Sequence, residues 1–258
     1  MFNKIINQYH YSFYENMGQI RLQKYLAQCG IGSRRACETY IEEGRIQIDG
    51  KIVTKQGMKI DPDLQSVCFD NNIISPKPIE WIMLNKPPQY LSSAKDPSGK
   101  ESFLSLLPEN KRHLFAVGRL DYLSEGLLLI TNEGGTANKI IHPRYEIEKE
   151  YLVCTLDELS KEQMELMRKG IVVNNERLSV KSIKNLENDR NSFFNYTIIL
   201  SEGKNRHIRK MLANQQIRIR SLKRIRIGQI HLKDLSSGKW RYLTEDERKL
   251  LNDMTKSQ

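Results

Sequence analysis

One apolar run, Leu127 to Ile130, constrains the fold of this chain more than any other feature. A short apolar run bounded by glycines is typical of a strand buried on both faces of a sheet. The residues just before such a strand lie at the rim of the sheet, where reactive side chains are commonly held. Asp121 occupies that place, with Arg119 two residues away. The segment therefore predicts a sheet whose rim carries an acid that could be a nucleophile, a base or half of a structural ion pair.

The charge of the chain indicates a polyanionic partner. The 258 residues include 41 Lys and Arg against 31 Asp and Glu, which gives a formal net charge of +10. Such a charge leaves nucleic acid and an anionic membrane surface both open. No apolar run approaches the ~20 residues that cross a bilayer, and no basic amphipathic helix with a wide apolar face is evident. We therefore expect nucleic acid as the partner and no membrane association.

Residues 1–19 form an N-terminal extension with no apolar core and no small-residue cleavage site, so a secretory signal is not indicated. Met17 is an alternative start. The four cysteines show no Cys-x-x-Cys spacing, and the five histidines form no helical ligand pair. We therefore expect buried thiols in a reducing, cytoplasmic compartment, with no metal or other cofactor.

Residues 20–79 are expected to form a small first domain and its joint to a larger one. Leu22 to Cys29 follow helical spacing, Ser33 is placed to cap a second helix, and Asp49-Gly50 predicts a hairpin turn. Residues 61–80 are rich in Asp, Asn, Pro and Ser and are expected to be the joint itself. The basic residues of this unit include Arg34, Arg35, Arg45 and Lys51. They are either solvated or, as we favour, bound to RNA phosphates.

Residues 80–258 are expected to form the second domain. Helical patterns cover 136–141, 160–170 and 205–214, and a last helix follows Thr244. Strand patterns cover 151–155 and 193–200. The connections are too short for regular crossover helices, so we expect an α+β fold with a mainly antiparallel sheet.

A basic tract runs from Gly203 to Gly228 and contains nine Lys and Arg residues and no Asp or Glu. A charge run is usually a solvated face, but solvated faces normally mix both signs. We therefore expect this tract to contact RNA phosphates, giving affinity rather than base identity. The residues assigned to that contact are Lys204, Arg206, Lys210, Arg218 and Arg220.

Several motifs occur together and in a fixed order. The first group is Gly118-Arg-Leu-Asp121, Ser124-x-Gly126-Leu-Leu-Leu, His142-Pro143 and Lys149-x-Tyr151, and the second is Gly203-Lys-Asn-Arg-His-Ile-Arg-Lys-Met211 and Leu222-x-Arg224-x-x-Ile227-Gly228. This ordered set resembles the RsuA/RluB family of ribosomal RNA pseudouridine synthases. Residues 20–50, with Ser33-Arg-Arg35 and Gly44-Arg-Ile-x-Ile-Asp-Gly50, resemble an αL-type S4 RNA-binding domain.

The resemblance implies roles for the matching positions. Asp121 corresponds to the catalytic aspartate, which attacks either the uracil ring or the ribose anomeric carbon of the target uridine. Both routes need an ionised carboxylate, and Arg209 matches its basic partner. Tyr151 matches the aromatic residue that packs on the unstacked target base, and Leu222 matches an apolar position beneath it. Arg119 belongs to the signature and contacts phosphate or the displaced stack.

The resemblance also implies a monomer that acts on ribosomal RNA or a pre-ribosomal particle, closer to the large-subunit type, without cofactor. Three positions depart from the family pattern: His207 stands where Gln is common, Ser124 where Thr is usual, and Gln89 where Gly is usual. The first two keep a polar group, whereas Gln89 puts the conformation of its loop in doubt. The alternative function is a non-catalytic RNA-binding or ribosome-assembly protein that retains the synthase fold.

Overall fold

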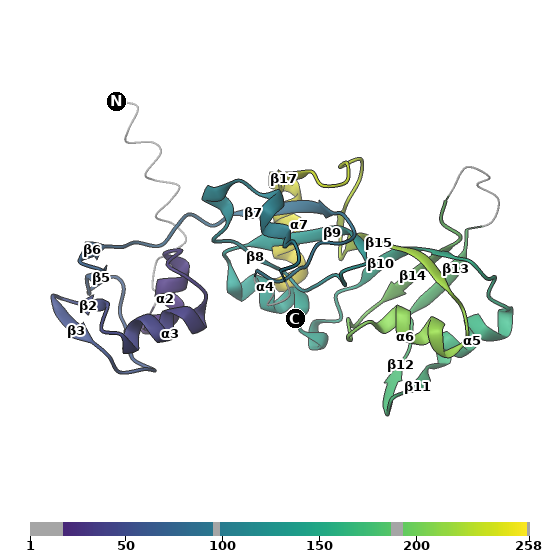
Figure 1. Ribbon diagram of the computed structural model, residues 1–258, viewed down its shortest axis with the longest axis horizontal. Coiled ribbons are helices and arrows are strands. Elements are labelled where there is room, and N and C mark those ends of the chain that lie inside the picture. Colours follow the sequence, from purple (N-terminus) through teal and green to yellow (C-terminus); the bar gives the residue numbers. More distant parts are fainter. Residues whose placement is uncertain (1–17, 95–98, 187–192, 257–258) are drawn as a thin grey trace. The chain divides into compact units, whose positions relative to one another are not determined.

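The computed structural model describes residues 18–94, 99–186 and 193–256 (Figure 1). The chain divides into two compact units, residues 1–79 and 80–258. The predicted N-terminal extension lies outside the described residues except for its last two. Among the described helices, none has the length and apolar character that a membrane span requires.

The first unit packs two helices against a four-stranded sheet. Its elements are β1 Ile20–Arg21, α2 Leu22–Gln28, α3 Arg34–Glu42, β2 Ile46–Ile48, β3 Lys51–Val53, β4 Lys59–Ile60, β5 Val67–Phe69 and β6 Asn72–Ile73. The predicted cap is confirmed, because the Ser33 hydroxyl accepts a hydrogen bond from the Ala36 amide at 3.2 Å. The predicted hairpin turn is also confirmed, since Asp49 and Gly50 have φ angles of 49° and 76° between β2 and β3.

The prediction that residues 61–80 form a joint is wrong for most of that segment. β5 pairs antiparallel with β2, and Val67 is buried in the core of the first unit. The Tyr25 hydroxyl donates to the Ile74 carbonyl at 3.1 Å, which ties the end of the segment back to α2. The short apolar piece Val67–Phe69 is therefore a sheet strand between turns at 62–64 and 70–71, and only the irregular residues after β6 connect the two units.

The second unit is built on a nine-stranded sheet with the order β13-β14-β10-β15-β9-β7-β17, to which β16 and β8 attach at β15 and β9. Its main strands are β7 Trp81–Lys86, β9 Glu125–Thr131, β10 Lys149–Thr155, β13 Ser182–Asn185, β14 Tyr196–Leu200, β15 Ile219–Ile227 and β17 Trp240–Tyr242, and its short ones are β8 Phe115–Ala116 and β16 Ile230–His231. Only the β9–β15 pair among these described strands is parallel. The expected α+β fold with a mainly antiparallel sheet is confirmed, and the apolar run of β9 is fully buried.

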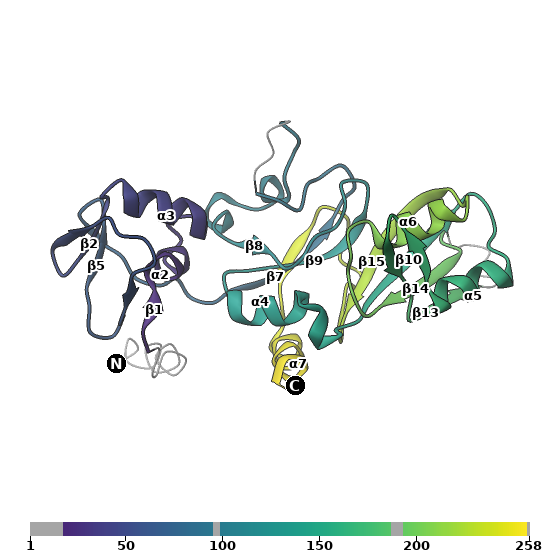
Figure 2. The ribbon, with the colours of Figure 1, turned by 90° about the horizontal axis from the view of Figure 1, so that it is seen from below.

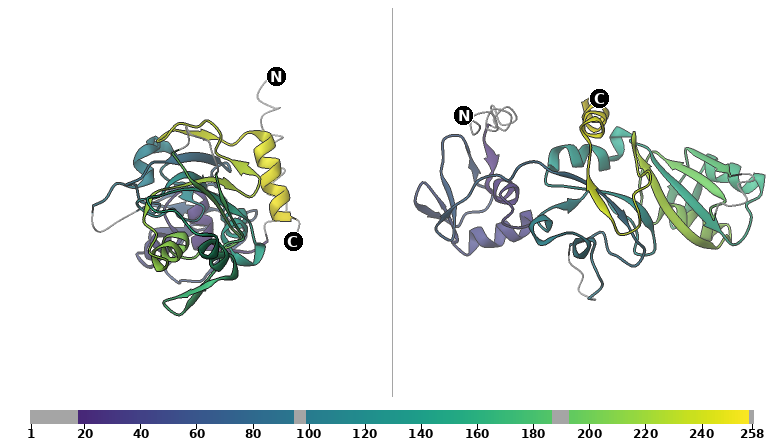
Figure 3. Two further views of the ribbon diagram at one scale, coloured as in Figure 1. Left: turned by 90° about the vertical axis from the view of Figure 1, so that its right-hand side faces the viewer. Right: turned by 90° about the horizontal axis from the view of Figure 1, so that it is seen from above.

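Helices cover the sheet in two places. α5 Lys161–Lys169 and α6 His207–Asn214 lie below β10, β13 and β14 in Figure 1 and bury Met167, Ile208 and Met211 in the main core. α4 Gly134–Ile141 and α7 Glu245–Lys256 lie together beside β7 and β9 (Figures 2 and 3). A hairpin, β11 Ile171–Val173 and β12 Glu176–Leu178, and three short 3₁₀ turns, η2 Phe103–Leu106, η3 Glu109–Lys111 and η4 Pro143–Tyr145, complete the unit.

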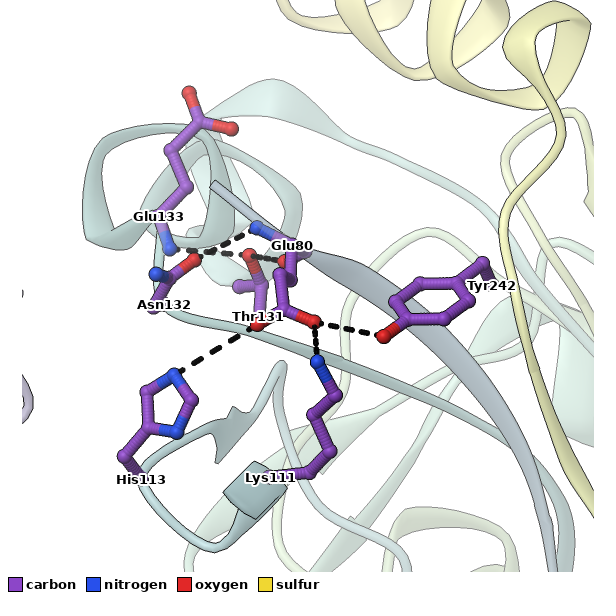
Figure 4. Close-up of polar contacts among 7 residues, drawn as sticks. All are labelled: Glu80, Lys111, His113, Thr131, Asn132, Glu133 and Tyr242. Atoms are coloured by element: carbon purple, nitrogen blue, oxygen red, sulfur yellow. Dashed lines mark hydrogen bonds and ion pairs between the residues drawn. The ribbon is translucent and has the colours of Figure 1, made fainter. Parts of the chain in front are cut away.

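A polar cluster fixes the start of the second unit (Figure 4). The Glu80 carboxylate forms an ion pair with Lys111 and accepts a hydrogen bond from the Tyr242 hydroxyl at 3.0 Å. The Glu80 backbone is held as well, because its amide donates to Asn132 at 2.9 Å and its carbonyl accepts from Thr131 at 2.6 Å. These contacts join the first residue before β7 to β9 and β17, so the entry to the central strands is set by side chains from across the sheet.

Candidate active site

A pocket opens in the second unit where the loop before β9 meets β10, β15 and α6. It is lined by Arg119, Leu120, Asp121, Ser124, Tyr151, Leu200, Arg206, His207, Ile208, Arg209 and Leu222. All five residues that the sequence assigned to catalysis and to binding of the target base are in this lining. They come from four separate segments of the chain, so the fold is what brings them together.

Asp121 and Arg209 form the charged centre of the pocket. Arg209 Nε lies 3.6 Å from Asp121 Oδ2, which is ion-pair distance but too long for a good hydrogen bond. The Arg209 Nη2 instead donates to the Leu123 carbonyl at 3.0 Å and to Ser124 Oγ at 3.2 Å. Burial lowers the pKa of Arg209, and the Asp121 charge opposes that shift. The carboxylate thus has a fixed positive neighbour while its own oxygens stay free of a direct hydrogen bond from it.

The loop that carries Asp121 is held at every backbone carbonyl from Arg119 to Leu123. The Arg119 carbonyl accepts from Arg224 Nη1 at 3.4 Å, and the Leu120 carbonyl accepts from Ser92 Oγ at 3.0 Å. The Asp121 carbonyl accepts from the Ser124 amide at 2.9 Å, and the Tyr122 carbonyl from the Gln89 amide at 2.6 Å. The Leu123 carbonyl accepts from Arg209 Nη2 at 3.0 Å. Ser92 Oγ also accepts from the Leu120 amide at 3.0 Å. A loop with so few free backbone groups has little conformational freedom, so the position of the Asp121 carboxylate is fixed before substrate arrives.

Arg224 is a buried part of this support that the sequence pattern did not single out. Its side chain is 4% exposed, and its Nε donates to the Leu127 carbonyl at 2.8 Å. Together with its bond to the Arg119 carbonyl, this bond joins β15 both to the loop before β9 and to β9 itself. Arg224 belongs to one of the quoted motifs, so that motif is the signal that could have identified it; Ser92 had no such signal.

Two neighbouring residues show how the loop after β7 is shaped. Gln89, which stands where the family has Gly, adopts a left-handed conformation with φ +66°. Lys86 is completely buried, and its Nζ donates to the carbonyls of Pro87 and Tyr90, both at 2.8 Å. Burial lowers the pKa of Lys86 to about 8, and the nearby Glu125 carboxylate opposes the shift. The loop therefore keeps the left-handed backbone conformation that glycine adopts readily, although Gln89 occupies the position.

Tyr151 and Leu222 form the apolar wall of the pocket. In the β10–β15 pairing, Tyr151 stands opposite Arg224 and Val153 opposite Leu222. Side chains two residues apart share one face of a strand, so Tyr151 and Leu222 face the same side as α6. Tyr151 is 8% exposed and Leu222 is 5% exposed. Both present apolar surface to the pocket beside Asp121.

His207 lines the pocket as a neutral group. His207 is 3% exposed, and within the described residues its ring nitrogens make no well-aligned hydrogen bond, although a contact with the Ser179 backbone remains. Burial lowers the pKa of His207, so the imidazole stays uncharged at neutral pH. An uncharged polar ring is a reasonable substitute for the glutamine amide that the family commonly has at this position.

The basic tract is less uniform than its sequence indicates. Acids outside the tract pair with several of its members: Lys204 with the nearby Glu202, Lys210 with Glu176, Arg218 with Asp157, and Arg226 with Glu148 and Glu150. Within the described residues, Arg206, Arg220 and Lys223 have no acidic partner. The members of the tract that keep uncompensated charge for RNA are therefore few.

The basic residues of the first unit also separate into those that have an acidic partner and those that do not. The Arg45 guanidinium donates to both carboxylate oxygens of Asp70, at 2.9 and 2.5 Å, and lies over the rings of Tyr40 and Phe69. Its fork is occupied inside the protein, which disfavours the expected contact with phosphate. Arg34, Arg35 and Lys51 are exposed and have no acidic partner in the part of the chain that the structure describes.

Comparison with known proteins agrees with this arrangement. Residues 80–214 match the family model described as RNA pseudouridylate synthase, and residues 20–65 match the S4 domain. The chain belongs to the RNA pseudouridylate synthase family. It is 34% identical over 233 residues to an RNA pseudouridine synthase of Aquifex aeolicus, covering 90% of this chain and 93% of that one. It is 33% identical to the ribosomal large subunit pseudouridine synthase B of Bacillus subtilis, over 90% and 95% of the two chains.

A solved structure supports the family fold over most of the chain. The crystal structure of a pseudouridylate synthase matches with a TM-score of 0.65 and 25% identity, covering 90% of this chain and 99% of that one. The expected resemblance to the RsuA/RluB type with an N-terminal S4 domain is therefore confirmed. As a family member this chain is an RNA-modifying isomerase, and the non-catalytic alternative loses its support.

Proposed function

We propose that this synthase converts a uridine of large-subunit ribosomal RNA into pseudouridine, with Asp121 as the nucleophile. The observation that carries the proposal is the Asp121–Arg209 pair at 3.6 Å inside a pocket with an aromatic and an apolar wall. The relatives in Bacillus subtilis and Pseudomonas aeruginosa that carry the name ribosomal large subunit pseudouridine synthase B support the choice of RNA.

Each side chain of the pocket has a role in this proposal. Arg209 places a positive charge beside the carboxylate, and at this separation their attraction is about 5 kcal/mol at an effective dielectric constant of about 20. Tyr151 packs on the target base, which must leave its stack to reach the pocket, and Leu222 lies beneath it. Arg119 is exposed at the rim and contacts a phosphate. During the reaction the N1–C1′ glycosidic bond breaks and a C5–C1′ bond forms, C5 loses a proton while N1 gains one, and the bond that Asp121 formed to the substrate is broken again, so the product is an isomer of the substrate.

RNA binding is assigned to both units. In the first unit the exposed Arg34, Arg35 and Lys51 are placed to neutralise phosphates, and in the second unit Arg206 extends the positive charge of the pocket rim. The S4 unit thus binds the phosphate backbone of the RNA, and the pocket of the second unit selects the nucleotide.

The test is the Asp121→Asn variant. The amide keeps the shape of the carboxylate but cannot act as an anionic nucleophile, so we expect pseudouridine formation to fall at least about 10³-fold with RNA affinity nearly unchanged. The measurement is chemical mapping of pseudouridine in large-subunit RNA from cells that carry either form of the gene. Asp157→Asn is the matched control, because Asp157 pairs with Arg218 outside the pocket. Activity that survives in the Asp121→Asn variant would remove Asp121 from the chemistry.

A further inference from the structure

A phenylalanine–arginine pair on the second unit has no part in the chemistry described above. Phe193 is 49% exposed, and the Arg220 guanidinium lies 4.7 Å from the centre of its ring. The ring of Phe194 meets Phe193 edge-on, with centroids 5.4 Å apart and planes at 87°. A half-exposed aromatic ring beside a cation presents a flat apolar face and a positive charge to solvent at one place.

The pair is built on a rigid part of the fold. Asn195, two residues after Phe193, accepts a hydrogen bond from the Thr155 amide at 2.9 Å and donates to Thr155 Oγ1 at 3.0 Å. These bonds fix the segment that leads into β14 to the end of β10. Arg220 is itself within β15. Arg220 is therefore held within the sheet, and Phe193 lies two residues before a position that is hydrogen-bonded to it, which lowers the entropy lost when a ligand binds.

Arg220 has no acidic partner among the described residues, which distinguishes it from other arginines in that part of the chain. Arg45 also lies over aromatic rings, but Asp70 occupies both arms of its guanidinium. Arg218, two residues away in sequence, is paired in the same way with Asp157 at 3.0 and 2.7 Å. An exposed aromatic ring with a free guanidinium has the two chemical features that bind an unpaired nucleotide.

The location suits a nucleotide near the target. Arg220 precedes Leu222 by two residues in β15, which corresponds to about 7 Å along a strand, and Leu222 lines the pocket. We propose that Phe193 and Arg220 form a stacking site for an unpaired nucleotide of the RNA substrate, with the base on the Phe193 ring and a phosphate on Arg220. This proposal rests on the proposed function, because it takes RNA as the ligand.

The experiment measures binding of a labelled 12-nucleotide oligouridine RNA to the full-length protein. Phe193→Ala is expected to weaken binding by about 5- to 100-fold, as loss of one stacked base does elsewhere. Phe193→Trp should keep the affinity, and its emission should be quenched by RNA more than that of the parent protein, whose Trp81 and Trp240 give the background. Arg220→Ala should weaken binding, whereas the control Arg218→Ala should change it by less than about twofold because Arg218 is already paired.

The outcomes separate this proposal from the proposed function. Equal affinity of Phe193→Ala and the parent protein, or no added quenching in Phe193→Trp, would overturn the stacking site. Failure of the parent protein to form pseudouridine in ribosomal RNA would instead overturn the proposed function, and that assay needs no stacking signal. Thermal melts of each variant identify any loss of binding that comes from unfolding.

Discussion

At the scale of single residues, the pocket places a positive charge beside the carboxylate that we propose as the nucleophile, without a strong hydrogen bond to it. A bidentate arginine would stabilise the anion but occupy its lone pairs, as Arg218 does with Asp157. Arg209 is held away from that geometry because its Nη2 is bound to Leu123 and Ser124, which leaves Nε 3.6 Å from the acid. Charge is thus supplied without a strong hydrogen bond, and the carboxylate oxygens remain available for attack.

Gln89 offers a test at the same scale. Its φ of +66° strains a residue with a side chain, whereas the amide that donates to the Tyr122 carbonyl would remain in glycine. We expect Gln89→Gly to raise the free energy of unfolding by about 0.5–1 kcal/mol, since relief of about 1–2 kcal/mol of strain exceeds the added chain entropy. Urea unfolding measures the change. Gln89→Ala is the control that keeps the strain, and a Gly variant no more stable than the Ala variant would contradict the interpretation.

The sequence predicted the pocket residues better than it predicted their support. Asp121, Tyr151 and Arg209 lie in motifs whose order identifies them, and the structure brings them into one pocket. Ser92 reaches the Leu120 carbonyl from 28 residues upstream, and no local pattern of a single serine indicates such a contact. The distant acids that pair with the basic tract were missed for the same reason, because sequence distance hides which charges the fold places together.

At the scale of elements, the parallel β9–β15 pair is the contact that assembles the site. Gly126 stands opposite Arg224 in that pair with a φ of +105°. A Cβ atom at Gly126 would lie 2.2 Å from the Arg224 carbonyl oxygen and 2.8 Å from its amide nitrogen. Both clashing atoms are backbone, so the strands would have to separate to admit a side chain. The glycine therefore allows β15 to approach closely enough for Arg224 to reach the Asp121 loop.

Gly126→Ala tests that argument. We expect a loss of about 3 kcal/mol or more in the free energy of unfolding, because the clash is with backbone and the φ angle is unfavourable for alanine. The measurement is a thermal melt, in which each kcal/mol shifts Tm by about 2–4 °C in a chain of this size. Gly135→Ala is the matched control: it lies in α4, nothing approaches its Cβ position, and its φ is not positive, so we expect a small gain in stability. Similar melts for the two variants would show that the close approach is not needed.

Elements with local chemical signals were predictable, and elements made by distant pairing were not. The Ser160–Gln163 capping box begins α5, and Thr244 and Glu247 cap α7, as the sequence indicated. Val67–Phe69 was assigned to a joint because its flanks are polar, yet it pairs with β2 some twenty residues earlier. The parallel pairing of β9 with β15 joins segments almost a hundred residues apart, and no local pattern reports it.

At the scale of the whole molecule, the net charge of +10 overstates how many side chains are available to RNA. Internal acids occupy Arg45 in the first unit and Lys210, Arg218 and Arg226 in the second. A cation that already has an acidic partner releases few counterions when a phosphate approaches, because the pair is close to neutral. The affinity for RNA should therefore depend on a small set of unpaired cations.

The salt dependence of binding tests this division. In a plot of log K against log salt concentration, each phosphate contact that is lost should lower the slope by about 0.7–0.9. Arg34 and Arg35 are exposed and unpaired among the described residues, so the double alanine variant should reduce the slope by about 1.5. The matched control replaces Lys210 and Arg218, which pair with Glu176 and Asp157, and should leave the slope nearly unchanged. Both double variants remove two positive charges, so equal loss of slope would mean that net charge, and not the pairing seen in the fold, governs RNA binding.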